Sequence, residues 1–149
     1  MMYSRNETLR AIGRMMARYA QDNAGGMDAD GIIESAPLMK PWQAGTMEAP
    51  VEYAKGDVRT YDGQPWKCSQ AHTHHGEEGW DPVSSRALWA PYHANRADYA
   101  LPYVQPTHAE DAYYIGEYMV YTDGKTYRCE ANAVSLPPDV LPDAWEVAS

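Results

Sequence analysis

The chain contains one pattern of residues twice, and this repeat limits the possible folds more than any other feature. Each copy has a glycine followed by an acidic residue, then a tyrosine, an Asp-Gly pair, a cysteine and a closing tryptophan. The first copy consists of Gly56-Asp57, Tyr61-Asp62-Gly63, Trp66-Lys67-Cys68 and Trp89, and the second of Gly116-Glu117, Tyr121-Thr122-Asp123-Gly124, Tyr127-Arg128-Cys129 and Trp145. A unit of roughly 50 residues has a marginal core of its own. We therefore expect the two copies, or the copies and the segment before them, to pack against each other.

The Asp-Gly pair in each copy predicts a β-hairpin. In the first copy the pair is Asp62-Gly63, between two short stretches with strand-like residues. The second copy has one additional residue, Thr122, before the pair. Because a plain insertion would turn every following side chain to the other face of the strand, we expect a three-residue loop in which Gly124 has left-handed backbone angles.

The N-terminal residues predict an amphipathic helix from about Ser4 to Asp22. Ser4 and Glu7 have the spacing of a capping box, in which each side chain accepts a hydrogen bond from the other residue's backbone amide. The apolar residues recur at helical spacing on one face, and arginines lie on another; these are Leu9, Ile12, Met16 and Tyr19, and Arg10, Arg14 and Arg18. The apolar stripe is suited to packing on its own chain or on a partner, and we expect its own chain.

A second, shorter helix is predicted to begin near Asp28 or Asp30 and to end before Pro37. After it, the short aromatic strands and glycine turns predict a mainly β fold. We expect three parts, which are an N-terminal helical segment over residues 1–40, a first β-module over 41–93 and a second, tandem β-module over 103–149.

The net charge argues against two classes of partner, and the sequence shows neither a signal peptide nor a membrane span. The formal net charge is −9, so the field around the protein repels nucleic acid and anionic bilayers, and we expect neither as a partner. The first ten residues show no secretory signal peptide, and no stretch approaches the roughly 18 apolar residues of a membrane span.

The two cysteines, Cys68 and Cys129, occupy matching places in the two copies. Two cysteines are too few for a disulfide framework. We therefore expect each thiol to fill the core of its own copy and the two not to pair.

The loop between Cys68 and Trp89 differs most between the copies. In the first copy it contains Trp80 between a glycine and an Asp-Pro turn, where an indole is hard to bury from both sides. In the second copy the loop is shorter and has Leu136-Pro137-Pro138 at the corresponding place. Residues present in both copies are explained by the fold, whereas Trp80 requires another explanation. We predict that it is a solvent-facing platform for binding.

The first copy resembles the chitin-binding module of bacterial chitinases, carbohydrate-binding module family 5/12. The resemblance depends on Gly56-Asp57, Tyr61-Asp62-Gly63, Lys67-Cys68-Ser69-Gln70-Ala71-His72-Thr73, Gly79-Trp80-Asp81-Pro82 and Ala87-Leu88-Trp89. It covers about Trp42 to His93 strongly and Tyr103 to Ser149 more weakly. Two such units behind a helical segment, without a catalytic domain, are also similar to small proteins encoded beside tail-fibre genes in phages and prophages.

The resemblance implies a small twisted, three-stranded β-sandwich for each module and a non-catalytic function, the binding of N-acetylglucosamine-type or cell-wall polysaccharide. It implies that Trp80 stacks on a sugar ring, supported by His72, Thr73 and Pro82. It further implies a protein present in several copies in a virion, or in the host cytoplasm before lysis.

The residues between Cys68 and Trp89 also suggest metal binding and glycoside hydrolysis, and the sequence supports both less well than sugar binding. The side chains of His72, His74, His75 and Glu77 are sensible zinc or nickel ligands, but a loop sets no ligand spacing, and we expect no metal and no cofactor. Glu77 and Glu78 are neighbours whose side chains point apart on an extended chain, so we expect no glycosidase pair and no enzyme. The alternative function is that of a structural adaptor of a phage tail fibre, in which Trp80 contacts another protein.

Overall fold

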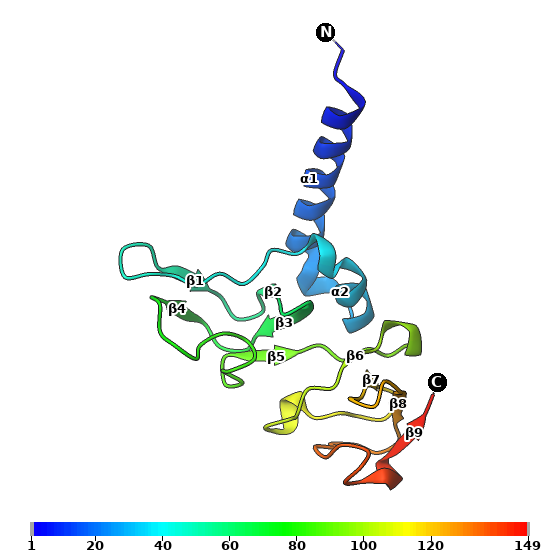
Figure 1. Ribbon diagram of the computed structural model, residues 1–149. Helices are drawn as coiled ribbons and strands as arrows, with labels where there is room; N and C mark the ends of the chain where they lie inside the picture. Colours follow the sequence, from blue (N-terminus) through cyan, green and yellow to red (C-terminus); the bar gives the residue numbers. More distant parts are fainter. Residues whose placement is uncertain (1, 149) are drawn as a thin grey trace.

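The computed structural model describes residues 2–148 and shows an N-terminal helical segment followed by small, mostly antiparallel sheets (Figure 1). The helices are α1 (Arg5–Asn23) and α2 (Ala29–Ser35). The strands are β1 (Val51–Tyr53), β2 (Val58–Tyr61), β3 (Gln64–Cys68), β4 (His72–His74), β5 (Trp89–Pro91), β6 (Leu101–Pro102), β7 (Tyr118–Val120), β8 (Thr126–Cys129) and β9 (Trp145–Val147). The predicted helical segment and mainly β character are therefore confirmed. Across residues 2–148, none of the helices combines the length and the apolar character needed to cross a membrane.

The strands form three sheets. Strands β1 and β4 make a two-stranded ribbon, and β2, β3 and β5 make a three-stranded sheet in that order. The remaining sheet has the order β6-β7-β8-β9, in which only the β6-β7 pair is parallel among the described strand pairs. The chain thus uses the same hairpin and closing strand twice, β2-β3-β5 and then β7-β8-β9.

Both predicted turns are confirmed. Tyr61 pairs with Gln64 across the first turn, where Asp62 has a φ of 51° and Gly63 a φ of 79°. Two successive positive φ values are typical of the two-residue type I′ hairpin, which suits the twist of the flanking strands. In the second copy the Tyr121 amide donates to the Lys125 carbonyl over 2.9 Å, and Gly124 has a φ of 80°. The three-residue loop absorbs Thr122.

The cysteines have equivalent places in the two copies. Cys68 is the β-sheet neighbour of Trp89, and Cys129 is the neighbour of Trp145. The backbone amide of Cys68 donates to the Asp57 carbonyl, and that of Cys129 donates to the Glu117 carbonyl, each over 2.8 Å. Both thiols are free, and each lies in a separate hydrophobic cluster, as predicted.

Neither thiol is expected to react in the native protein. Both cysteines have an exposed fraction of 0%, and burial raises the pKa of each thiol above 9.0. Since the thiolate is the reactive form, a thiol reagent at about pH 8 should label neither residue until denaturant is added, and then both. Mass spectrometry of the labelled chain measures this. Rapid labelling of either cysteine without denaturant would contradict the two buried positions.

The base of the helical segment packs on the first β-copy. Ala20 and Ala24 join Ile32, Met39 and Val58 in one buried cluster. Gln21 adds two hydrogen bonds, because its amide nitrogen donates to the Val58 carbonyl over 3.1 Å and its oxygen accepts from the Lys40 amide over 2.8 Å. The expected packing between the β-structure and the preceding segment is present at this base.

The outer part of α1 does not pack on the body, so the expectation that its apolar stripe docks on its own chain is wrong. The predicted capping box is present, with both hydrogen bonds between Ser4 and Glu7. However, every residue from 2 to 16 is exposed, and α1 projects away from the sheets (Figure 1). The helix meets the body only toward its C-terminal end, where Ala17 and Gln21 are half-buried and Ala20 is buried, and it therefore carries its apolar stripe into solvent.

The two copies meet around the buried carboxylate of Asp111, which has an exposed fraction of 1%. The amides of Thr107 and His108 each donate to it over 2.9 Å, and the Thr107 hydroxyl donates over 3.1 Å. From the first copy, the Arg86 guanidinium approaches Asp111 to 3.7 Å and lies 5.3 Å from the centre of the Trp66 ring. Asp111 and Arg86 thus join the second copy to the core of the first.

Candidate functional site

Trp80 lies in the loop between β4 and β5, and local hydrogen bonds hold that loop. Gly79 has a φ of 76°, a backbone conformation that favours glycine. Directly after Trp80, the side chain of Asp81 accepts a hydrogen bond from the Ser84 amide over 3.1 Å. The backbone carbonyl of Asp81 accepts another from the Ser85 amide over 2.9 Å. The turn presents the Trp80 side chain outward, with an exposed fraction of 36%.

Two imidazoles support the Trp80 indole. The ring centres of His72 and His74 both lie 6.3 Å from it, at interplanar angles of 67° and 53°. Residues two apart on a strand share a face, so β4 presents both histidines toward the indole. The platform therefore rests on the β1-β4 ribbon and still faces solvent.

His74 is a buried structural histidine with an exposed fraction of 2%. Its Nδ1 lies 2.8 Å from the Gly45 amide, which can only donate, and its Nε2 lies 2.9 Å from the Glu77 carbonyl, which can only accept. These partners require the neutral tautomer with the proton on Nε2. A Cβ atom at Gly45 would lie 2.0 Å from the His74 carbonyl oxygen, so this close approach requires glycine. Both ring nitrogens of His74 are thereby occupied.

His72 connects the exposed indole to the core. Its Nδ1 lies 2.7 Å from the Gln70 carbonyl, and its ring packs edge-on against the buried Trp89 with centres 5.7 Å apart. Tyr53 of β1 contacts the same imidazole at 5.4 Å. A ring held on these sides has little freedom to rotate, which keeps the support of Trp80 in place.

The other two predicted site residues lie elsewhere. Thr73 pairs with Glu52 of β1 and alternates with the histidines, so its side chain lies on the opposite face of β4. A surface hollow at the edge of this ribbon is lined by both His72 and Thr73. Pro82 is fully buried and shapes the loop without offering surface to a ligand. The structure thus brings His72 to Trp80 but separates Thr73 and Pro82 from its exposed face.

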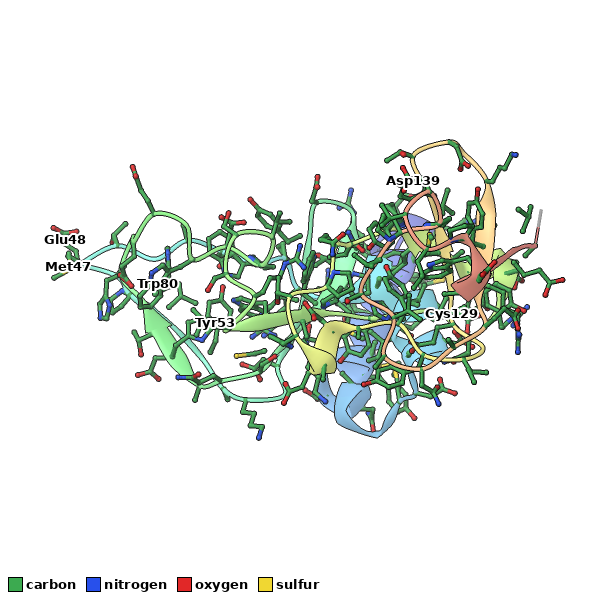
Figure 2. All side chains as sticks on the ribbon, turned by 90° about the horizontal axis from the view of Figure 1, so that it is seen from below. Met47, Glu48, Tyr53, Trp80, Cys129 and Asp139 are labelled. Carbon is green, nitrogen blue, oxygen red and sulfur yellow. The ribbon has the colours of Figure 1, made fainter. Side chains whose placement is uncertain are left out.

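Sequence reasoning missed a neighbouring loop over residues 46–49. Met47, with an exposed fraction of 76%, and Glu48 lie at the same end of the molecule as Trp80 (Figure 2). The loop is closed by the Thr46 amide, which donates to the Ala49 carbonyl over 3.1 Å. Met47 and Glu48 follow no motif in the sequence, and the pairing of β1 with β4 is what carries their loop toward the Trp80 loop.

The second copy lacks this platform. The residue at the same distance before the closing tryptophan is Leu136, with an exposed fraction of 43%, and Pro138 is buried as Pro82 is. The counterpart of the β1-β4 ribbon is reduced to one bridge between Tyr113 and Val134. The second copy therefore presents an aliphatic side chain where the first presents an indole.

The loop histidines do not gather into a metal site. In the part of the chain that the structure describes, no three His, Cys, Asp or Glu side chains lie close enough together to hold a metal ion. His75 and Glu77 form a partly exposed pair with 3.4 Å between Nδ1 and Oε1. Together with the occupied nitrogens of His74, this arrangement has the character of a hydrogen-bonded loop.

Comparison with known proteins finds that the same part of the chain is similar to a carbohydrate-binding module. Residues 41–90 match the model of carbohydrate-binding module family 5/12. Chitinase Chi52 of Paenibacillus xylanexedens is 46% identical over 48 residues, which are 32% of this chain and 8% of that protein. The crystal structure of a family GH18 chitinase from Chromobacterium violaceum aligns with a TM-score of 0.31 and 27% identity over 42% of this chain and 17% of that one. The chain thus spans a small part of each relative, and the matched segment contains Trp80.

Proposed function

We propose that the protein binds a chitin-type polysaccharide without cleaving it, through stacking of a sugar ring on Trp80. The observation that carries the proposal is the exposed indole, supported by His72 and His74, inside the segment that matches a carbohydrate-binding module. The axial C–H face of an N-acetylglucosamine ring is apolar and slightly positive, so it is attracted to the negative face of an indole. Glu48 at the same end of the molecule is an acceptor for sugar hydroxyls (Figure 2).

The proposed organisation is a helical segment over residues 1–40, a binding module over 41–93 and a second module over 103–149. The matching Cys68–Trp89 and Cys129–Trp145 pairs support a repeated framework. Leu136 has no ring face for a sugar, so the first module performs the binding and the second serves as a spacer.

Replacing Trp80 by alanine is expected to abolish retention on insoluble chitin. One stacked ring contributes about 1 to 3 kcal/mol, by analogy with base stacking on aromatic residues, and its loss lowers affinity roughly 5- to 150-fold. Leu136→Ala is the matched control, because it truncates an exposed apolar residue at the equivalent place of the other copy. The bound fraction of purified protein, measured in pull-down against chitin and against cellulose, checks both variants.

Equal retention of the Trp80→Ala variant and the unaltered protein would refute stacking on this indole. A loss with Leu136→Ala as large as with Trp80→Ala would show that the second copy also binds. Unchanged retention after treatment with EDTA is expected, since the site uses ring stacking and hydrogen bonds.

A second candidate function is that of a structural adaptor in a phage tail fibre, which would place the protein in the virion. Trp80 and Met47 are exposed at one end of the molecule with Glu48, and aromatic and methionine side chains are enriched at protein interfaces. An adaptor would form a stable complex with a neighbouring fibre protein that Trp80→Ala breaks, and it would pass through chitin unretained. The two measurements therefore separate the candidates.

A further inference from the structure

We propose that α1 associates with the α1 helices of other copies of this chain and forms a short coiled coil. The first ground is exposure, because every residue from 2 to 16 is exposed on a helix that projects from the body (Figure 1). The large apolar side chains on this helix include Leu9, Ile12, Met15, Met16 and Tyr19, with exposed fractions of 54, 44, 65, 53 and 69%. Such a stripe on a helix is ordinarily covered.

The spacing of the stripe is that of a coiled-coil seam. Leu9, Ile12, Met16 and Tyr19 are separated by three, four and three residues, which is the alternation of a and d positions over two heptads. The helix that carries them is already capped by Ser4 and Glu7, and it is anchored at its base through Ala20 and Ala24. Because α1 is already helical, its association costs little additional conformational entropy.

The charges on α1 favour a second copy as the occupant. The positions that flank the seam hold uncharged residues over its length, namely Thr8, Gly13, Met15 and Ala20. Charged residues at these flanking positions are what select an unlike partner in coiled coils, and like charges there repel an identical one. The arginines Arg10, Arg14 and Arg18 lie at outer positions of the heptad, away from the seam. From Leu9 to Tyr19, no charge at the seam or beside it therefore opposes pairing of identical helices, and the nearest charge in line with the seam is Arg5 at the first position of α1.

A lipid surface is the other chemistry that a basic amphipathic helix can meet, and the observations favour it less. Arg10, Arg14 and Arg18 lie on the face opposite the stripe, which is the placement of cationic side chains on an interfacial helix, but the rest of the chain opposes contact with an anionic surface. Beyond residue 23 the chain carries 19 acidic and eight basic residues, so the body is repelled by an anionic bilayer.

Two heptads are fewer than the three or four of a stable coiled coil, so association should depend on concentration.

The effect of this association on sugar binding rests on the proposed function. A single stacking site is weak, and copies joined through α1 would engage one polymer together, which raises retention without any new contact.

Sedimentation velocity tests the association directly. Between about 1 μM and about 1 mM, a range that covers weak protein pairs, the average mass of the unaltered protein is expected to rise from 16.7 kDa toward a multiple of that value. Ile12→Glu introduces a charge into the seam and should keep the mass at 16.7 kDa over the whole range. Ala11→Glu makes the same charge change on the neighbouring outer position and should associate as the unaltered protein does.

Far-UV circular dichroism of both variants at low concentration confirms that α1 is still folded in each. A constant single-chain mass of the unaltered protein up to about 1 mM would overturn the proposal, as would equal dissociation by Ala11→Glu and Ile12→Glu. Binding of the single chain to phosphatidylcholine–phosphatidylserine vesicles, seen as co-sedimentation that is lost in Ile12→Glu, would also overturn the proposal. Trp80→Ala should leave the mass unchanged, so a failure of sugar binding and a failure of self-association are distinguishable.

Discussion

Trp89→Ala is expected to lower the free energy of unfolding by about 3 to 5 kcal/mol, which is typical of removing a fully buried aromatic side chain. Trp89 has an exposed fraction of 0% and packs in one cluster with Tyr53, Trp66 and Cys68. Alanine in its place would leave a cavity that these neighbours cannot fill. Denaturant unfolding followed by circular dichroism measures the change.

Trp80→Ala is the matched comparison, since it removes the same type of side chain from the loop that leads into β5. The loss of stability should be about 1 kcal/mol, because 36% of this side chain is exposed and its aromatic contacts are with two imidazoles at 6.3 Å. A large loss of stability in Trp80→Ala would mean that the indole is part of the core, and its effect on chitin retention would then be uninformative. The stability measurement therefore precedes the binding experiment.

Asp111→Ala is expected to lower the free energy of unfolding by about 3 to 5 kcal/mol, as for the removal of one partner of a buried ion pair. The change removes the acceptor for Thr107 and His108 and leaves Arg86 without its carboxylate at the junction of the two copies. Asp98→Ala is the control. It breaks an exposed ion pair with Arg96, at 2.6 Å, and should change stability little, despite the shorter distance.

The same carboxylate predicts a dependence of stability on acid pH. Burial by itself raises the pKa of Asp111, but hydrogen bonds from His108 and Thr107 outweigh it and hold the pKa below its ordinary value of 3.8. The folded state therefore binds this proton less readily than the unfolded chain does. The stabilisation is complete above pH 3.8 and is lost as the pH falls through the lower pKa of the folded state. Between about pH 5 and 2, the free energy of unfolding should fall more steeply for the unaltered protein than for Asp111→Ala. Parallel curves would contradict the role of this carboxylate.

Features that depend on neighbouring residues were predicted from the sequence. The capping box at Ser4 and the hairpin at Asp62-Gly63 each require a few residues in a fixed order, and both are present. The insertion of Thr122 also led to the correct loop, because the side-chain period of a strand leaves few ways to absorb one residue.

The docking of α1 was predicted wrongly because an apolar stripe shows that a face suits burial and does not identify what buries it. Gln21, Ala20 and Ala24 attach the base of the helix to the body, and the path of the chain after Asn23 leads away from the outer turns. That path depends on packing between residues far apart in the sequence.

The amino-acid sequence by itself determined the helical start, the two hairpins, the unpaired cysteines and the tryptophan that only one copy has. Local hydrogen bonding and strand periodicity are sufficient for these features. Only the tertiary structure decided that His72 and His74 support Trp80, that Thr73 and Pro82 lie away from its exposed face, and that α1 stands free. The placement of these side chains depends on the pairing of β1 with β4 and on close contacts such as Gly45 with His74, and the direction of α1 depends on packing at its base. All of these contacts join residues distant in the chain and leave no periodic pattern in its sequence.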